Sequence, residues 1–191
     1  MGRIYQKVNQ WFRPSANGVL VEIGSDRGEG STQWFDTLAG QHGKKLISVD
    51  VVSKAKNRWQ QTLTNTEFVV QDGTEWAQQF AQTNVTIDSL YLDNFDYIWD
   101  INNVSAAIEL QMLEYSQRGV TMTNQQCQVA HLKQLIALHS CLSPTAVVVF
   151  DDTYCYNDCW IGKCGAAVVY LLSQGWHVAD QSLDCGVILT K

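Results

Sequence analysis

Three apolar segments of the sequence end in acidic residues, and a glycine-rich turn follows the first of them. Glu22 lies near the end of VLVEI, Asp50 ends LISVD, and Asp72 follows FVVQ. The turn contains Gly24, Ser25, Gly28, Gly30 and Ser31, and Gly73 follows Asp72. Glycine permits a sharp turn and lets a ligand approach the backbone, because it has no Cβ. This combination is typical of a site for a small ligand at the ends of strands.

The acid before the turn indicates the type of ligand. A carboxylate at Glu22 would repel a pyrophosphate but can pair with the cationic amino-acid group of S-adenosylmethionine (SAM), and the glycine spacing is not GxGxxG. Asp50 stands where a carboxylate can accept hydrogen bonds from a ribose diol, and Asp72 can bond the exocyclic amine of an adenine. The alternatives are glycines that only reverse the chain and aspartates that only cap helices.

A second group of acids follows two later apolar segments. Asp93 comes after LYL, and Asp151 and Asp152 come after VVVF. We expect these segments to be neighbouring parallel strands, so that the three carboxylates converge and need a proton or a cation between them. An all-oxygen cluster suits Mg²⁺ or a similar divalent cation, which can orient a substrate hydroxyl and lower its pKa. The alternative is that Asp93 only orients SAM and the other two acids cap a loop.

The residue that removes a proton from the acceptor is harder to assign. No lysine lies between Asp93 and Lys133, so the candidates are His131, Asp96 or the metal alone. We take Asp93 and His131 as the catalytic candidates, although a lone histidine on a helix is more often a packing residue. Aromatic side chains on the expected acceptor side either bind a planar or sugar substrate or pack in the core: Trp99, Tyr154, Tyr156 and Trp160.

Alternating strand and helix patterns predict one α/β domain over residues 1–191. The strands are expected at Gly18–Ile23, Lys45–Val49, Glu67–Val70, Ile87–Leu92, Thr145–Phe150, Trp176–Ala179 and Gly186–Thr190. The helices are expected at Ser31–Ala39 (with Ser31 as its cap), Lys54–Thr62, Thr74–Gln82, Gln125–Cys141 and Lys163–Gln174, the last ending at Gly175. Because only a few residues join the last two strands, this pair must be antiparallel.

Residues 94–124 form a longer connection than is usual between a strand and a helix. This segment is either a lid or substrate-binding insertion or an extra packed helix. Little chain precedes the first strand, so a substrate lid has to come from residues 94–124 or from the second subunit of a homodimer.

The composition excludes several other classes. A net charge of −6 without a basic cluster disfavours nucleic-acid binding. No apolar run approaches the roughly 18 residues of a membrane span, and the N-terminus lacks the apolar region of a secretory signal. We therefore expect a cytoplasmic protein with reduced cysteines; Cys155, Cys159, Cys164 and Cys185 do not have the paired spacing of a zinc site.

These residues resemble the class I SAM-dependent methyltransferases from about Gly18 to Thr190, with residues 94–124 outside the resemblance. The resemblance implies a Rossmann-like seven-stranded sheet of order 3-2-1-4-5-7-6, with an antiparallel last strand and helices on both faces. It also implies that the glycine turn holds the methionine part of SAM, that Asp50 holds the ribose, and that Asp72 and Gly73 meet the adenine.

Within that class the chain is similar to the catechol-type, metal-dependent O-methyltransferases and their bacterial relatives acting on sugars and macrolides. It departs from their pattern at Asp151-Asp152, where the catechol type has Asp-Asn, and in lacking a lysine soon after Asp93. The expected function is O-methylation of a small hydroxylated molecule with help from a divalent metal. The alternative is a SAM-binding module or partner subunit without activity. The absence of an Asp-Pro-Pro-Tyr type sequence after Asp93 disfavours methylation of base nitrogens, and the glycine spacing disfavours an NAD-linked oxidoreductase.

Overall fold

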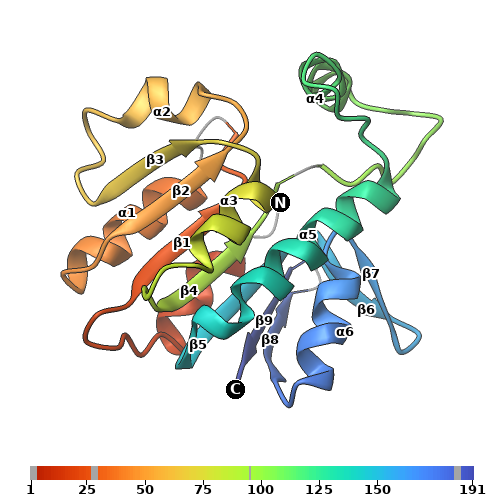
Figure 1. The fold of residues 1–191 in the computed structure, drawn as a ribbon. Helices are drawn as coiled ribbons and strands as arrows, with labels where there is room; N and C mark the ends of the chain where they lie inside the picture. The colour runs from red at the N-terminus through yellow and green to blue at the C-terminus, as the bar shows by residue number, and fades with distance from the viewer. Residues whose placement is uncertain (1–3, 27–29, 95, 183–185) are drawn as a thin grey trace.

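The computed structural model describes residues 4–26, 30–94, 96–182 and 186–191, which form one mixed sheet with helices on both faces (Figure 1). The strands are β1 Val19–Ile23, β2 Leu46–Asp50, β3 Thr66–Val70, β4 Ile87–Leu92, β5 Leu142–Asp151, β6 Thr153–Tyr156, β7 Cys159–Gly162, β8 His177–Ser182 and β9 Gly186–Thr190. The α-helices are α1 Ser31–Gln41, α2 Lys54–Trp59, α3 Gly73–Phe80, α4 Ala106–Ser116, α5 Asn124–Leu138 and α6 Gly165–Ser173, and short 3-10 helices span Ile4–Gln10 (η1) and His139–Cys141.

The main sheet has seven strands in the order β3-β2-β1-β4-β5-β9-β8. The first five strands are parallel, and β9 runs antiparallel to both β5 and β8. When the separate β6–β7 hairpin is left out of the count, this is the order expected from the sequence, with the antiparallel last strand. The carboxyl ends of β1, β2, β4 and β5 therefore meet at one edge, which positions the expected acids together.

Alternate residues of the central strands pack on opposite faces of the sheet. Val21, Leu90 and Val148 belong to the cluster formed with α3, α5 and α6. Leu20 and Val147 belong to the cluster formed with η1 and α1. This two-sided burial explains why the strands read as nearly continuous apolar runs.

Several boundaries differ from those expected. Ser31 does not cap α1; Gly30 is the N-cap, with a φ of 73°, and Ser31 is the first helical residue. The final helix starts at Gly165 rather than Lys163, because the chain first turns back through β6 and β7. Its end is as expected, since Gly175 has the positive φ (83°) of a residue that follows a helix.

Residues 94–124 contain helix α4, which lies apart from the two main helical layers (Figure 1). Ser105 caps its start by accepting a hydrogen bond from the backbone N–H of Ile108. Tyr115 near its end packs with Met122 and Cys127 in a small separate core that also contacts Val51. Tyr115 thus anchors α4 beside the carboxyl edge of the sheet while most of the helix stays exposed, and the choice between a lid and a packed helix stays open. Of the helices in the described part of the chain, none has the length and apolar character needed to cross a membrane.

Candidate functional site

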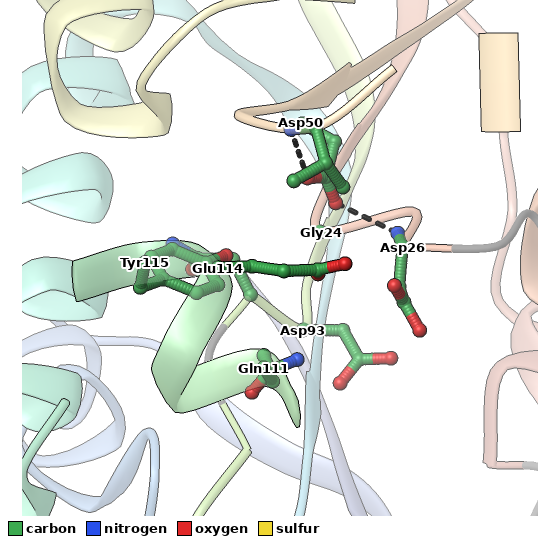
Figure 2. Close-up of a pocket in the computed structure, with 9 residues that line it drawn as sticks. Gly24, Asp26, Asp50, Asp93, Gln111, Glu114 and Tyr115 are labelled. Carbon is green, nitrogen blue, oxygen red and sulfur yellow. Dashed lines mark hydrogen bonds between the residues drawn. The ribbon is translucent and has the colours of Figure 1, made fainter. Parts of the chain in front are cut away.

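A pocket lies at the carboxyl ends of β1, β2 and β4, under helix α4 (Figure 2). Its lining consists of the first glycine of the turn, acids from three strand ends or the loops after them, and residues of α4: Gly24, Asp26, Asp50, Val52, Asp93, Asn94, Gln111, Glu114 and Tyr115. The structure therefore brings together the expected residues Gly24, Asp50 and Asp93. Gly28 lies outside the described residues.

Gly24 allows the chain to turn where two strand ends meet. Its φ is 103°, and a Cβ at this position would lie 2.2 Å from the backbone nitrogen of Asn94. A larger residue would therefore push the loop after β4 away from the turn. The glycine is needed for this close approach of two backbone segments, and the same open backbone faces the pocket.

Asp50 is held so that its carboxylate faces the pocket. One oxygen accepts the backbone N–H of Asp26 at 2.7 Å, and the other accepts that of Val52 at 2.9 Å. Burial raises the pKa of Asp50 to about 6, against the effect of these two donors and of the backbone N–H of Ser25. A carboxylate has about four acceptor positions, and those that the backbone does not use can receive a ribose hydroxyl. The geometry fits the role expected for Asp50.

Glu22 is completely buried beneath the turn rather than lining the pocket. Its Oε2 accepts hydrogen bonds from the hydroxyls of Thr32 at 2.7 Å and Ser48 at 2.9 Å. Burial raises its pKa to about 7. Its Oε1 has no partner among the described residues. Glu22 thus joins α1 to β1 and β2, and its expected contact with a ligand ammonium stays a prediction.

Asp72 acts as the N-cap of α3. Its Oδ1 accepts the backbone N–H groups of Thr74 at 2.8 Å and Glu75 at 3.0 Å. This is the helix-capping alternative considered from the sequence. Gly73 begins the helix, and a Cβ there would lie 2.5 Å from Ile23. Neither residue lines the pocket, so their expected contact with adenine also stays a prediction.

Helix α4 contributes pocket residues that the sequence analysis did not identify. Glu114 forms a 2.7 Å ion pair with Lys54 at the start of α2, and Tyr115 is buried beside it. Lys54 also lies 3.7 Å from Asp26 in the turn. These contacts connect α4 to the glycine turn and hold the helix over the pocket.

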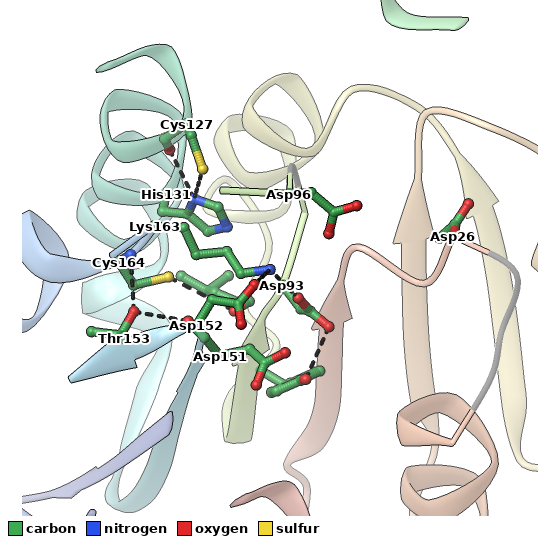
Figure 3. Close-up of polar contacts among 12 residues, drawn as sticks. Asp26, Asp93, Asp96, Cys127, His131, Asp151, Asp152, Thr153, Lys163 and Cys164 are labelled. Carbon is green, nitrogen blue, oxygen red and sulfur yellow. Dashed lines mark hydrogen bonds and ion pairs between the residues drawn. The ribbon is translucent and has the colours of Figure 1, made fainter. Parts of the chain in front are cut away.

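The expected metal ligands converge, but around a lysine. The ammonium of Lys163, whose side chain is 1% exposed, lies 2.5 Å from Oδ1 of Asp93 and 3.2 Å from Oδ2 of Asp152 (Figure 3). Burial alone would lower the pKa of Lys163, but the carboxylates around it, Asp93 first, raise that pKa well above its usual value. Burial and the charge of Asp93 raise the pKa of Asp151 well above its usual value. We call Asp93, Asp151 and Asp152 the acid trio.

The acid trio does not fit a divalent cation. Oδ1 of Asp93 accepts from the Lys163 ammonium and Oδ2 accepts from the hydroxyl of Tyr91 at 2.9 Å, so both oxygens are engaged. Across the described residues, no group of three or more His, Cys, Asp or Glu side chains is arranged to hold a metal. The described residues therefore do not form the expected metal site, because Lys163, which the sequence pattern places at a helix start, lies among the acids.

His131 lies fully buried in α5, on the other side of Lys163 (Figure 3). Its Nδ1 lies 2.8 Å from the carbonyl oxygen of Cys127, which assigns the ring proton to Nδ1. Burial, together with the charge of Lys163, lowers its pKa to about 3. Its Nε2 has no partner within the described part of the chain. His131 is thus a neutral imidazole with a free acceptor nitrogen.

Asp96 lies near the same group and is partly buried. Burial raises the pKa of its carboxyl, and the charge of Lys163 opposes that rise. The aromatic residues expected at the acceptor side differ in position: Trp99 stacks on Tyr154 with ring centroids 5.6 Å apart, whereas Trp160 packs against the core and Tyr156 is 62% exposed. Tyr97 adds a third ring, 4.6 Å from Trp99.

Comparison with known proteins rests on structure alone. No family model matches the chain, and no curated protein is significantly similar in sequence. The O-methyltransferase NovP is 14% identical, with a TM-score of 0.59 over 98% of this chain and 76% of NovP. CalS11, a TDP-rhamnose 3'-O-methyltransferase of calicheamicin biosynthesis, is 15% identical, with a TM-score of 0.56 over 98% of this chain and 75% of CalS11.

A third solved structure is similar over nearly the full length of both chains. SMU.1697c of Streptococcus mutans, a methyltransferase candidate solved in complex with SAH, is 12% identical, with a TM-score of 0.56 over 100% of this chain and 99% of that one. The strand order and the position of the pocket at the carboxyl edge are consistent with these structural similarities. The chain has the fold of the class I methyltransferases.

Proposed function

We propose that this chain binds SAM in the pocket under α4 and transfers its methyl group to a hydroxyl of a small molecule. The observation that carries the proposal is Asp50, a buried carboxylate that keeps free acceptor positions in a pocket at the carboxyl edge of this fold. Gly24 would lie along the methionine part of the ligand, and Asp50 would hold the ribose diol. The acidic lining supports binding of a cationic ligand.

The acceptor would lie between the acid trio and the stacked rings of Trp99 and Tyr154. SAM supplies the methyl group as an electrophile. The acceptor hydroxyl loses its proton and forms the new O–C bond, while the carbon–sulfur bond breaks and its electron pair stays on sulfur. Asp96, which is partly buried and has a raised pKa, can take the proton. The Nε2 of His131 is fully buried behind Lys163, so a catalytic role for His131 would need this region to open.

Calorimetry with SAM and with SAH tests the cofactor part of the proposal. The wild type should bind both, and Asp50→Asn should bind SAM at least about tenfold more weakly because it loses a charged acceptor. Asp36→Asn is a matched control, since Asp36 is also a buried carboxylate that accepts a backbone N–H (from Asn65, 3.0 Å) but lies outside the pocket. A folded wild type without SAM affinity would refute the proposal.

Incorporation of a labelled methyl group separates an enzyme from a binding module. The protein is incubated with labelled SAM and a panel of sugars, catechols and other hydroxylated compounds, and the products are examined for methyl ethers. SAM binding with transfer only to amines or thiols would contradict O-methylation. SAM binding without transfer to any acceptor would favour the non-catalytic module.

A further inference from the structure

Lys163 is positioned by a hairpin built to return the chain to Asp152. Strands β6 and β7 pair antiparallel, with Thr153 opposite Gly162. Gly162 has a φ of 96°, and a Cβ there would lie 1.9 Å from the carbonyl oxygen of Asp152. Only glycine fits this approach, so the register places the next residue, Lys163, directly beside the acids.

Backbone and hydroxyl contacts fix the lysine on both sides. The backbone N–H of Lys163 donates to the carbonyl oxygen of Asp152 at 3.1 Å. The backbone N–H of Cys164 donates to the hydroxyl of Thr153 at 3.0 Å, and that hydroxyl donates to the carbonyl of Asp151 at 2.8 Å. These contacts hold the backbone of Lys163 beside the acids, and its side chain points into the acid trio (Figure 3).

The ammonium also excludes a divalent cation from this position. A bound cation such as Mg²⁺ needs carboxylate oxygens at about 2.0–2.1 Å and Ca²⁺ at about 2.3–2.6 Å. Oδ1 of Asp93 and Oδ2 of Asp152 already face the ammonium at 2.5 Å and 3.2 Å. A second positive charge within a few ångströms of a buried ammonium would be strongly repelled.

We propose that the ammonium of Lys163 takes the place of a divalent cation in the acid trio, so that methyl transfer by this chain needs no metal. This inference rests on the proposed function for its catalytic consequence, but its structural content stands without it. Lys163 is a positioning residue: buried behind the carboxylates, it offsets part of their negative charge and holds Asp93 and Asp152 in place. Because no metal activates the acceptor, its proton has to pass to a protein group, and the partly buried Asp96 beside the acid trio can take it.

The test measures Mn²⁺ binding, which requires neither SAM nor an acceptor. Free Mn²⁺ is followed by electron paramagnetic resonance in titrations of the wild type, Lys163→Ala and the control Lys7→Ala, which removes a surface ion pair with Asp180. We expect the wild type and Lys7→Ala to bind Mn²⁺ weakly or not at all. Lys163→Ala should bind at least about tenfold more tightly, because the acid trio regains an open cation position. Adding Asp152→Asn to Lys163→Ala should abolish that gain.

Activity gives a second readout once an acceptor is known. Wild-type transfer should be unchanged by EDTA or added Mg²⁺, whereas Lys163→Ala should lose activity and regain part of it with Mg²⁺ or Mn²⁺. A merely structural lysine would show no metal rescue.

The outcomes separate this inference from the proposed function. Wild-type Mn²⁺ binding that Asp152→Asn removes would overturn the inference, as would a folded Lys163→Ala without any gain in affinity. If Lys163→Ala does not fold, the wild-type titration alone decides. Failure of SAM binding would refute the proposed function and leave the Mn²⁺ result intact.

Discussion

The affinity for SAM should fall as the pH falls through the pKa of Asp50. Burial raises that pKa to about 6 in the ligand-free protein. The ionised carboxylate is the form that can accept hydrogen bonds from both ribose hydroxyls, since the protonated form turns one oxygen into a donor. SAM therefore binds the deprotonated protein better, and binding has to remove the proton when the pH is below about 6.

The size of the effect follows from the fraction of ionised Asp50. At about pH 7.5 almost every Asp50 is ionised, so the dissociation constant has its limiting value. At about pH 5, one unit below the pKa, roughly one molecule in eleven is ionised, and the dissociation constant should be about tenfold higher, which is about 1.4 kcal/mol.

Calorimetric titrations of SAM between about pH 5 and pH 7.5 measure this change. Asp50→Asn should bind more weakly at the upper end and lose this part of the pH dependence, while Asp36→Asn should follow the wild type. A wild-type dissociation constant that stays constant over this range, with the protein folded, would show that Asp50 does not receive the ligand as an anion.

Three further predictions concern Glu22, the aromatic pair and α4. Because the pKa of Glu22 is about 7 in the folded chain against about 4.5 when unfolded, the folded state holds the extra proton between these values and loses stability as the pH rises through them. Glu22→Gln should therefore gain about 3 kcal/mol relative to the wild type between about pH 4.5 and pH 7.5, measured by urea unfolding, and a constant difference would contradict the buried-acid interpretation. Trp99→Ala should raise KM for the acceptor about threefold to tenfold without changing SAM affinity, whereas Tyr156→Ala, at an exposed position, should change neither; an equal effect of both would remove the stacked pair from the site. Glu114→Gln breaks a partly exposed ion pair and should speed SAM dissociation by up to about fivefold in stopped flow, and Glu109→Gln on the exposed side of α4 is its control.

The sheet could be predicted from the sequence because its physical signals are local. Runs such as VLVEI and VVVF are apolar on both faces, and the short connection before β9 requires an antiparallel pair. The position of the strand ends at one edge follows from that topology, and Asp50 and Asp93 both line the pocket there. Asp72 shows the limit of the method, since a strand-end acid for a ligand and an N-cap have the same sequence.

The position of Lys163 beside the acid trio was not predicted, because it depends on the turn between β6 and β7. Asn157 and Asp158 have φ values of 47° and 61°, the left-handed pair that a tight hairpin between TYCY and CWIG requires. That signal was present in the sequence and would have placed Gly162 opposite Thr153. The contribution of α4 to the pocket was harder to predict from the sequence. Its apolar residues lie on all sides of the helix, and Leu110 and Leu113 remain more than half exposed.

The proposed replacement of a metal by Lys163 affects which form of the cofactor, SAM or its product, the pocket binds better. An ammonium carries one positive charge where Mg²⁺ carries two, so the acid trio keeps one more negative charge than it would around a metal. Asp93, a member of the trio, also lines the pocket with Asp26 and Asp50. The extra negative charge attracts the sulfonium of SAM but not the neutral thioether that remains after transfer. If Lys163 takes the place of a metal as proposed, the pocket would favour binding of SAM over its product, and deprotonation of the acceptor would fall to Asp96.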